Sequence, residues 1–251
     1  MFNLFKKRLV AEKDISRLEI VSAGSPFAYA EAYRSLRTNL NFVTHLKKYR
    51  KLLLTSSLPN EGKSSVAINL AYILAENGYR VILIDCDLRN PMLHKYLRAQ
   101  RYRMTGLSTV LSGTCTVEEA IARFSDLKFH LMTAGPIPPN PAELLASEDM
   151  GDLLDALAVK YDYVICDTPP VSLVTDAVVL SQHCDGTLLI VRQNYASFDE
   201  VKKTKRSLKN VNADIIGCVL NQYDISADVK ISKYSGAYYQ YEYSSKEGEM
   251  K

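Results

Sequence analysis

Hydrophobic and polar positions follow two different patterns along this chain, and together they are typical of a mixed α/β protein. Over residues 27–47, apolar residues recur at the spacing of helical turns, which predicts an amphipathic helix. Farther on, continuous apolar runs such as Val81–Ile84 and Thr187–Val191 end in polar turns. Runs of this kind are typical of strands in a parallel sheet that is covered on both faces.

The same patterns predict strands and helices that follow one another in turn. Strands are expected over 51–56, 80–86, 127–133, 161–167, 185–192 and 213–220. Helices are expected over 27–47, 63–77, 116–123, 149–160, 174–182 and 198–209, with a proline-rich loop at 134–148. This alternation predicts an α/β fold, a doubly wound and mostly parallel sheet with helices on both faces. Such sheets bind ligands at the carboxyl ends of their strands.

Composition and length then narrow the picture. The 251 residues suit one large domain at 27–223, preceded by an irregular segment, 1–26, and followed by a polar, flexible tail, 224–251. The net charge of +3 is too small to indicate nucleic-acid binding, and no apolar run is long enough for a transmembrane helix. The five cysteines form no C-x-x-C pair, and most are expected to be core residues in a reducing compartment.

A phosphate-binding loop is predicted between the strand 51–56 and the helix that begins at Lys63. Its Gly-Lys-Ser core suits backbone amides and a lysine that bind a polyphosphate, and the pattern indicates the P-loop NTPase type of sheet. Ser57 occupies the position of the first glycine of the usual pattern, and an ordinary strand-to-helix turn is the alternative. The predicted nucleotide contacts are Ser57, Pro59, Asn60, Glu61, Gly62, Lys63, Ser64 and Ser65.

Two of the apolar strands end in carboxylates. Asp85 and Asp87 close the strand 80–86 and are expected to point the same way, and Asp167 closes the strand 161–167. One such acid often caps a helix, but three beside a phosphate loop suit Mg²⁺ and a catalytic base. The predicted catalytic residues are Lys63, Asp85 as the base, and Asp87. Ser64, Asp87 and Asp167 are predicted to hold Mg²⁺, and the cofactors are ATP and Mg²⁺.

The tyrosines are concentrated near the end of the chain. Five of the 16 tyrosines lie among Ser, Gly, Gln and Glu, without aliphatic neighbours that would form a core. They are predicted to be phosphate acceptors, although the alternation of three of them also fits an edge strand. The predicted acceptors are Tyr234, Tyr238, Tyr239, Tyr241 and Tyr243.

On these motifs the chain resembles the bacterial tyrosine kinases of P-loop type, in particular the cytoplasmic kinase of capsule and exopolysaccharide systems. The resemblance covers essentially the whole chain. Its Walker A motif is the loop from Ser57 to Ser64, its Walker B motif runs from Val164 to Pro170 and contains Asp167, and the Asp-x-Asp-x-Arg-x-Pro element begins at Asp85. That element, combined with the tyrosine cluster, is the most selective part of the match.

The resemblance implies autophosphorylation in trans on the tail tyrosines, within a homo-oligomeric ring that is typically an octamer. Glu31, Arg34 and Arg37 match the family's E-x-x-R-x-x-R subunit-contact motif, and Asn221 matches a position near the adenine base. It also implies a transmembrane polysaccharide co-polymerase whose cytoplasmic tail activates the kinase, a tyrosine phosphatase and other protein substrates. The kinase would be cytoplasmic and recruited to the inner face of the membrane by its activator.

The residues alone allow three other interpretations of the protein that carries this loop. A partitioning or positioning ATPase of the same superfamily would carry a second lysine five residues before Lys63, where this chain has Leu58. An iron–sulfur electron-transfer ATPase needs cysteines in loops that face a partner subunit. A regulatory ATPase without kinase chemistry would not need the intact acids Asp85, Asp87 and Asp167.

Overall fold

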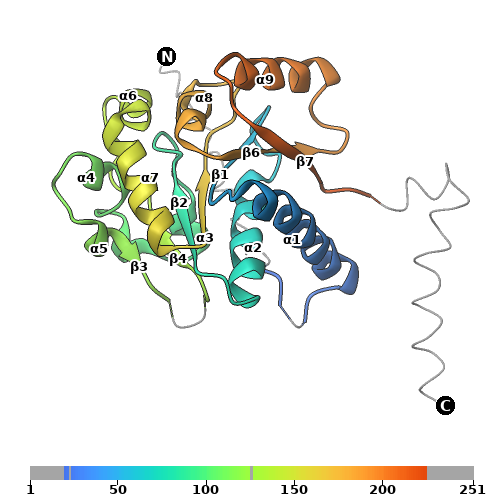
Figure 1. Cartoon of the computed structure of the whole chain (residues 1–251), viewed down its shortest axis with the longest axis horizontal. Helices are drawn as coiled ribbons and strands as arrows, with labels where there is room; N and C mark the ends of the chain where they lie inside the picture. Colours follow the sequence, from blue (N-terminus) through green and yellow to red (C-terminus); the bar gives the residue numbers. More distant parts are fainter. Residues whose placement is uncertain (1–19, 23, 125–126, 225–251) are drawn as a thin grey trace, which may run out of the picture.

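The computed structural model describes residues 20–22, 24–124 and 127–224, which form a layered α/β unit around one twisted sheet (Figure 1). Seven strands lie in the order β3-β4-β2-β5-β1-β6-β7, and all neighbours are parallel except β3 and β4. The predicted fold class is confirmed. The strands are β1 (Lys51–Ser56), β2 (Val81–Asp85), β3 (Ile121–Ala122), β4 (His130–Met132), β5 (Tyr163–Asp167), β6 (Gly186–Arg192) and β7 (Ile215–Asn221).

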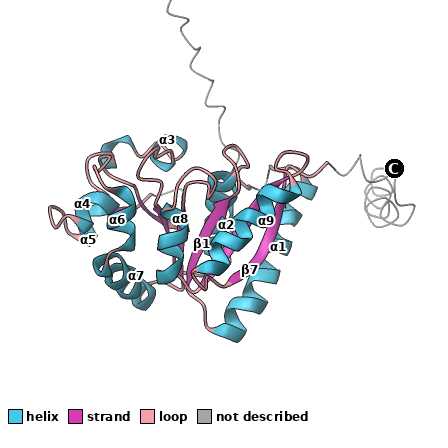
Figure 2. Ribbon diagram, turned by 90° about the horizontal axis from the view of Figure 1, so that it is seen from above, coloured by secondary structure: helices cyan, strands magenta, loops and turns pink. Residues whose placement is uncertain are grey.

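Helices cover both faces of the sheet, because neighbouring residues of each central strand point to opposite sides. Leu52 and Leu54 of β1 pack in the cluster that contains α1 and α2, whereas Leu53 packs in the cluster that contains α7 and α8 (Figure 2). The helices are α1 (Phe27–Lys47), α2 (Lys63–Glu76), α3 (Leu93–Tyr96), η1 (Gln100–Tyr102), α4 (Leu107–Leu111), α5 (Val117–Ala120), α6 (Pro141–Ala146), α7 (Glu148–Lys160), α8 (Asp176–Leu180), η2 (Ser181–His183) and α9 (Phe198–Asn210).

The predicted helix over 116–123 is wrong in its second half. The helix ends at Ala120, and Ile121 and Ala122 continue as β3, antiparallel to Met132 and Leu131 of β4. Ile121 and Ala122 are buried apolar residues whose backbone groups pair with a neighbouring strand, a long-range contact that local periodicity does not report. Four short helices, α3, η1, α4 and α6, were not predicted; they are only three to six residues long, and α6 interrupts the predicted loop at 134–148.

The ends of the described chain are anchored to this unit. Val21, which precedes the predicted domain start, is buried, and its backbone N–H donates to Asn69 Oδ1 of α2 at 2.7 Å. At the other end, the N–H of Asp224 donates to Gln193 Oε1 at 2.6 Å. The five predicted acceptor tyrosines lie outside the described residues.

The cysteines divide according to their strands. Cys86, which directly follows β2, and Cys166 of β5 are buried, as expected. Cys218 is exposed, which contradicts the expectation that its apolar run is a core strand. The reason is that β7 is an edge strand with a partly solvated face. No helix in the described part of the chain is long and apolar enough to cross a membrane.

Candidate active site

The carboxyl ends of β1, β2 and β5 meet at one cavity of about 290 Å³. Asp85 and Asp167 are register partners in the parallel pair β2–β5, so the two carboxylates lie side by side where these strands end. The loop after β1 and the first turn of α2 form the opposite wall. The cavity therefore joins the two predicted motifs, the phosphate loop and the acidic strand ends, at the place expected for a doubly wound sheet.

Most of the predicted site residues line this cavity. They are Pro59, Asn60, Glu61, Gly62, Lys63, Ser64, Ser65, Asp85, Asp87 and Asp167. The other two, Ser57 and Asn221, do not line it. Ser57 is buried, and its Oγ has no hydrogen-bond partner among the described residues. The cavity also has an apolar wall, which no local sequence motif predicts. It is formed by Met92, Tyr96, Leu173 and Val174.

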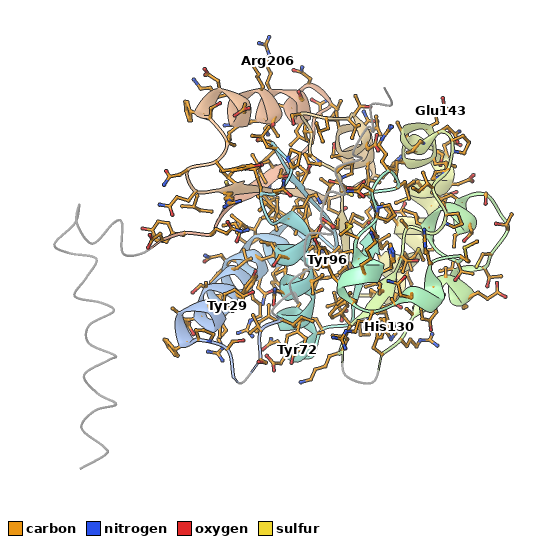
Figure 3. The ribbon with its side chains drawn as sticks, turned by 180° about the vertical axis from the view of Figure 1, so that it is seen from behind. Tyr29, Tyr72, Tyr96, His130, Glu143 and Arg206 are labelled. Atoms are coloured by element: carbon orange, nitrogen blue, oxygen red, sulfur yellow. The ribbon has the colours of Figure 1, made fainter. Side chains whose placement is uncertain are left out.

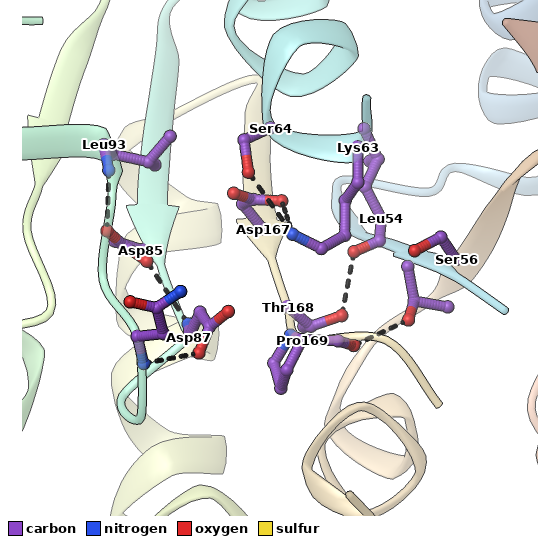
Figure 4. A network of polar contacts seen from close by, with 12 residues as sticks. Leu54, Ser56, Lys63, Ser64, Asp85, Asp87, Leu93, Asp167, Thr168 and Pro169 are labelled. Atoms are coloured by element: carbon purple, nitrogen blue, oxygen red, sulfur yellow. Dashed lines mark hydrogen bonds and ion pairs between the residues drawn. The ribbon is translucent and has the colours of Figure 1, made fainter. Parts of the chain in front are cut away.

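Lys63 provides the positive charge of the site. Its side chain is only 10% exposed, and its Nζ lies 3.3 Å from Asp167 Oδ1 and 3.3 Å from Ser64 Oγ (Figure 4). Burial lowers the pKa of Lys63, but the carboxylates of Asp167, Asp87 and Asp85 outweigh it, so the net pKa is raised. Lys63 is therefore a permanent cation at the floor of the cavity.

Asp85 is fully buried and is held by backbone donors. Its Oδ2 accepts the N–H of Leu93 at 3.0 Å, and its Oδ1 accepts the N–H of Asp87 at 3.3 Å (Figure 4). Burial, followed by the charge of Asp167, raises the pKa of Asp85 to about 8. A carboxyl group with a pKa near the operating pH suits a general base.

Asp87 differs from its predicted position. β2 ends at Asp85, and the chain then turns, so that Asp87 Oδ1 accepts the N–H of Asn90 at 2.9 Å instead of continuing an extended segment. The turn still leaves Asp87 on the cavity, half-buried, and burial raises its pKa.

Asn221 and Glu61 hold the phosphate loop in place from behind. The Asn221 side-chain amide donates to the Glu61 carbonyl at 2.8 Å, and Glu61 Oε2 accepts the N–H of Leu58 at 2.7 Å. Glu61 Oε1 also accepts the N–H of Arg192 from β6 at 3.2 Å. A buried glutamate thus ties the loop to its neighbouring strand. Asn221 supports the loop in this structure, and its contact with an adenine base stays a prediction.

Arg89 links the loop after β2 to α8. Its guanidinium donates to both carboxylate oxygens of Asp176, at 2.8 and 3.0 Å, and Asp176 is fully buried. These residues are far apart in sequence, so spacing could not reveal the pair. The bidentate contact fixes the acidic loop against the second wall of the cavity.

The residues present fit a nucleotide with Mg²⁺. Gly62 has a φ of +82°, and Lys63 and the first turn of α2 face the cavity with their amide groups and ammonium group. Asp167 Oδ1 is buried but accepts no aligned hydrogen bond, so this oxygen is available as a ligand for Mg²⁺. In the described residues no group of three or more His, Cys, Asp or Glu side chains could hold a metal alone. Nucleotide oxygens would therefore complete the coordination of Mg²⁺.

The fold and this site define a P-loop nucleotide-binding protein, and comparison with known proteins narrows the class. A family model described as an AAA domain matches residues 60–216. The tyrosine-protein kinase YwqD of Bacillus subtilis is 36% identical over 197 residues, 78% of this chain and 82% of that protein. The chain belongs to the bacterial tyrosine-protein kinases.

Two further comparisons agree with this membership. The kinase domain of the Escherichia coli tyrosine kinase ETK superposes with a TM-score of 0.73 at 33% identity, and 77% of each chain is covered. A Klebsiella pneumoniae protein, described as a putative tyrosine-protein kinase in the cps region, is 34% identical over 220 residues. The match spans 87% of this chain but only 30% of that protein.

Proposed function

We propose that this kinase transfers the γ-phosphoryl group of ATP to tyrosines near its own C-terminus, in trans between subunits of a homo-oligomeric ring. One observation carries the proposal: Lys63 and the buried carboxyl of Asp85 line the same cavity. A cation for the phosphates and a base for an incoming hydroxyl thus lie within one site. The acceptors are the five tyrosines between Tyr234 and Tyr243.

In the proposed reaction, a tyrosine hydroxyl attacks the γ-phosphorus while the bond to the β-phosphate oxygen breaks. The hydroxyl proton passes to Asp85, and the products are ADP and phosphotyrosine. Lys63 lowers the pKa of Asp85, which opposes the effect of burial and keeps part of this carboxyl ionised. Lys63 and the loop amides stabilise the charge on the phosphates as it moves toward the leaving oxygen. Ser64, Asp87 and Asp167 would hold Mg²⁺, which would supply further positive charge at the phosphates.

The biological setting follows from relatives and is part of the proposal. The name of the Klebsiella relative places it in a cps region, which supports a role in regulating capsule or exopolysaccharide synthesis. In that setting the cytoplasmic tail of a transmembrane polysaccharide co-polymerase recruits and activates the kinase, and a tyrosine phosphatase reverses the modification. Glu31, Arg34 and Arg37 on α1 are the proposed subunit contact. The Glu31 and Arg34 side chains are exposed and form an ion pair at 3.3 Å.

The decisive experiment is mass spectrometry of the full chain after incubation with Mg-ATP, with and without a candidate activator tail. Phosphate on Tyr234 to Tyr243, absent from the Lys63→Met variant, is the expected result. ATP hydrolysis without phosphotyrosine under both conditions would instead support a positioning or regulatory ATPase. Phosphotyrosine elsewhere, for example on Tyr223, would keep the activity and change the acceptors.

A further inference from the structure

A second cavity of about 430 Å³ lies beside the active-site cavity. The two cavities share Arg89 and Asn90, so their rims are continuous. The second cavity is lined by the loop after β2, by α3, by the turn after η1 and by the segment after β4. A polypeptide that presents one side chain to the active site can thus place a neighbouring side chain in the second cavity.

The lining of the second cavity carries positive charge. Lys95 and Arg103 line it, both are exposed, and neither forms an ion pair with another described residue. His94 also lines it, and its pKa is lowered by burial and then by the charges of Lys95 and Arg103. The third cation, Arg89, is already paired with Asp176. No acidic side chain lines the cavity.

The lining also contains apolar side chains, and part of its backbone is held by hydrogen bonds. Met104 and Ile137 are 71% and 64% exposed, and Pro136 lies next to Ile137. The carbonyl of Pro136 accepts the hydroxyl of Ser108 at 2.7 Å, and the N–H of Ser108 donates to the carbonyl of Ala134 at 2.9 Å. These bonds hold the wall against α4. Exposed apolar side chains next to unpaired cations favour a ligand that has both an apolar body and an anionic end.

We propose that this cavity binds the phosphotyrosine side chain of a tyrosine segment whose next tyrosine occupies the active site. The proposal rests on the function proposed above and names its preferred substrate. A phosphotyrosine carries about −1.5 to −2 charges at neutral pH, which suits Lys95 and Arg103, and its ring suits Met104, Pro136 and Ile137. A segment that is already phosphorylated once then becomes a better substrate than an unmodified one.

The spacing of the predicted acceptors supports this pairing. Tyr239, Tyr241 and Tyr243 alternate in the sequence. In an extended peptide, alternate side chains project to the same side, roughly 6–7 Å apart. In the proposed complex, two such tyrosines on one face of an extended segment occupy the two adjoining cavities.

The test compares synthetic peptides that carry the sequence 236–246 with Tyr241 as the single acceptor. Position 239 or 243 holds phosphotyrosine, Glu or Phe, and the remaining tyrosines are Phe. The enzyme is the full chain with Mg-ATP, as wild type and as the variant Lys95→Ser with Arg103→Ser. A matched control is Lys205→Ser with Arg206→Ser on α9, where Arg206 lies away from Tyr96 of α3 (Figure 3).

We expect kcat/KM to be at least tenfold higher for a phosphotyrosine peptide than for the Phe peptide. The Lys95/Arg103 variant should lose this preference while its rate with the Phe peptide stays within twofold of wild type, and the Lys205/Arg206 variant should keep it. Equal kcat/KM for both peptides, or a preference that survives in the Lys95/Arg103 variant, would overturn the proposal. A preference for Glu equal to that for phosphotyrosine would show a general anion site instead.

Direct binding separates this proposal from the kinase proposal. Fluorescence anisotropy of a labelled phosphotyrosine peptide without ATP should show at least tenfold weaker binding to the Lys95/Arg103 variant, whether or not any peptide is phosphorylated. Phenyl phosphate should displace the labelled peptide at a lower concentration than inorganic phosphate does. Equal effective concentrations of the two competitors would contradict recognition of the ring. Phosphopeptide binding without any phosphoryl transfer would leave the second cavity supported and the proposed kinase reaction refuted.

Discussion

Lys63 Nζ lies 3.3 Å from Asp167 Oδ1, so the cation of the phosphate loop is neutralised by a carboxylate at the end of a neighbouring strand. Both side chains are almost completely buried. In this arrangement a polyphosphate competes with Asp167 for the ammonium group. Nucleotide binding would then free Asp167 to hold Mg²⁺.

Lys63→Met should therefore reduce tyrosine phosphorylation by at least about 100-fold, because the charge on the phosphates loses its buried cation. Anti-phosphotyrosine blotting and mass spectrometry measure this loss. The matched control is Lys51→Met at the opposite end of β1, where the lysine pairs with Asp155 at 2.6 Å. This control should keep the activity, and an active Lys63→Met variant would refute the role of the loop lysine.

The stability of the nucleotide-free Asp85→Asn variant relative to wild type should increase as the pH rises from about 4 to about 8. The folded-state pKa of Asp85 is raised to about 8, above its unfolded value, so the folded state holds the proton more tightly. In wild type, the Asp85 carboxyl makes its full contribution to the free energy of unfolding below its unfolded-state pKa. This contribution is lost as the pH rises toward the folded-state pKa, by at most about 1.4 kcal/mol per pH unit. Thermal unfolding of both proteins from pH 5 to 8 measures the difference. Parallel curves would show that Asp85 ionises freely in the folded state.

Gly62→Ala should impair the phosphate loop far more than a glycine replacement at another positive φ. A Cβ at Gly62 would clash with the side-chain amide of Asn221, whereas a Cβ at Gly78, with a φ of +91°, meets nothing within 4 Å. In both variants an alanine must adopt a positive φ, which costs about 1 kcal/mol. Gly78→Ala is therefore the control for this backbone effect. Isothermal titration should show loss of ATP binding for Gly62→Ala alone.

Adding Asn221→Ala to Gly62→Ala should recover part of the lost stability, because it removes the amide that the new methyl group meets. The two changes would then be non-additive in a double-mutant cycle of unfolding free energies. Additive effects would place the conflict elsewhere in the loop.

Replacing Glu31, Arg34 and Arg37 with Ala should disrupt the oligomer but not the fold. The Glu31–Arg34 pair is exposed, and such pairs contribute less than about 1 kcal/mol to folding. Sedimentation velocity should show smaller particles at an unchanged melting temperature, and trans phosphorylation should fall. A triple Ala variant at Lys202, Lys205 and Arg206 of α9 controls for lost surface charge. An unchanged sedimentation coefficient would rule out this contact.

Much of the fold was predictable because its signals are local. The apolar runs of β1, β2, β5 and β6 identified the buried strands, and the Gly62-Lys63-Ser64 core marked the start of α2. Short elements such as β3 escaped prediction, because two residues carry too little pattern and depend on β4 for pairing. The edge position of β7, which leaves Cys218 exposed, is likewise decided by strand order and not by composition.

The sequence by itself determined the family, the phosphate loop and the acids at the strand ends, because these depend on residue type and short spacing. Only the tertiary structure decided which groups meet. It placed Asp85 beside Asp167, paired Arg89 with Asp176, and turned Asn221 toward the loop. It also set the Lys95 and Arg103 cavity beside the active site. Residues so far apart in the chain come together through sheet pairing and burial, which no local pattern encodes.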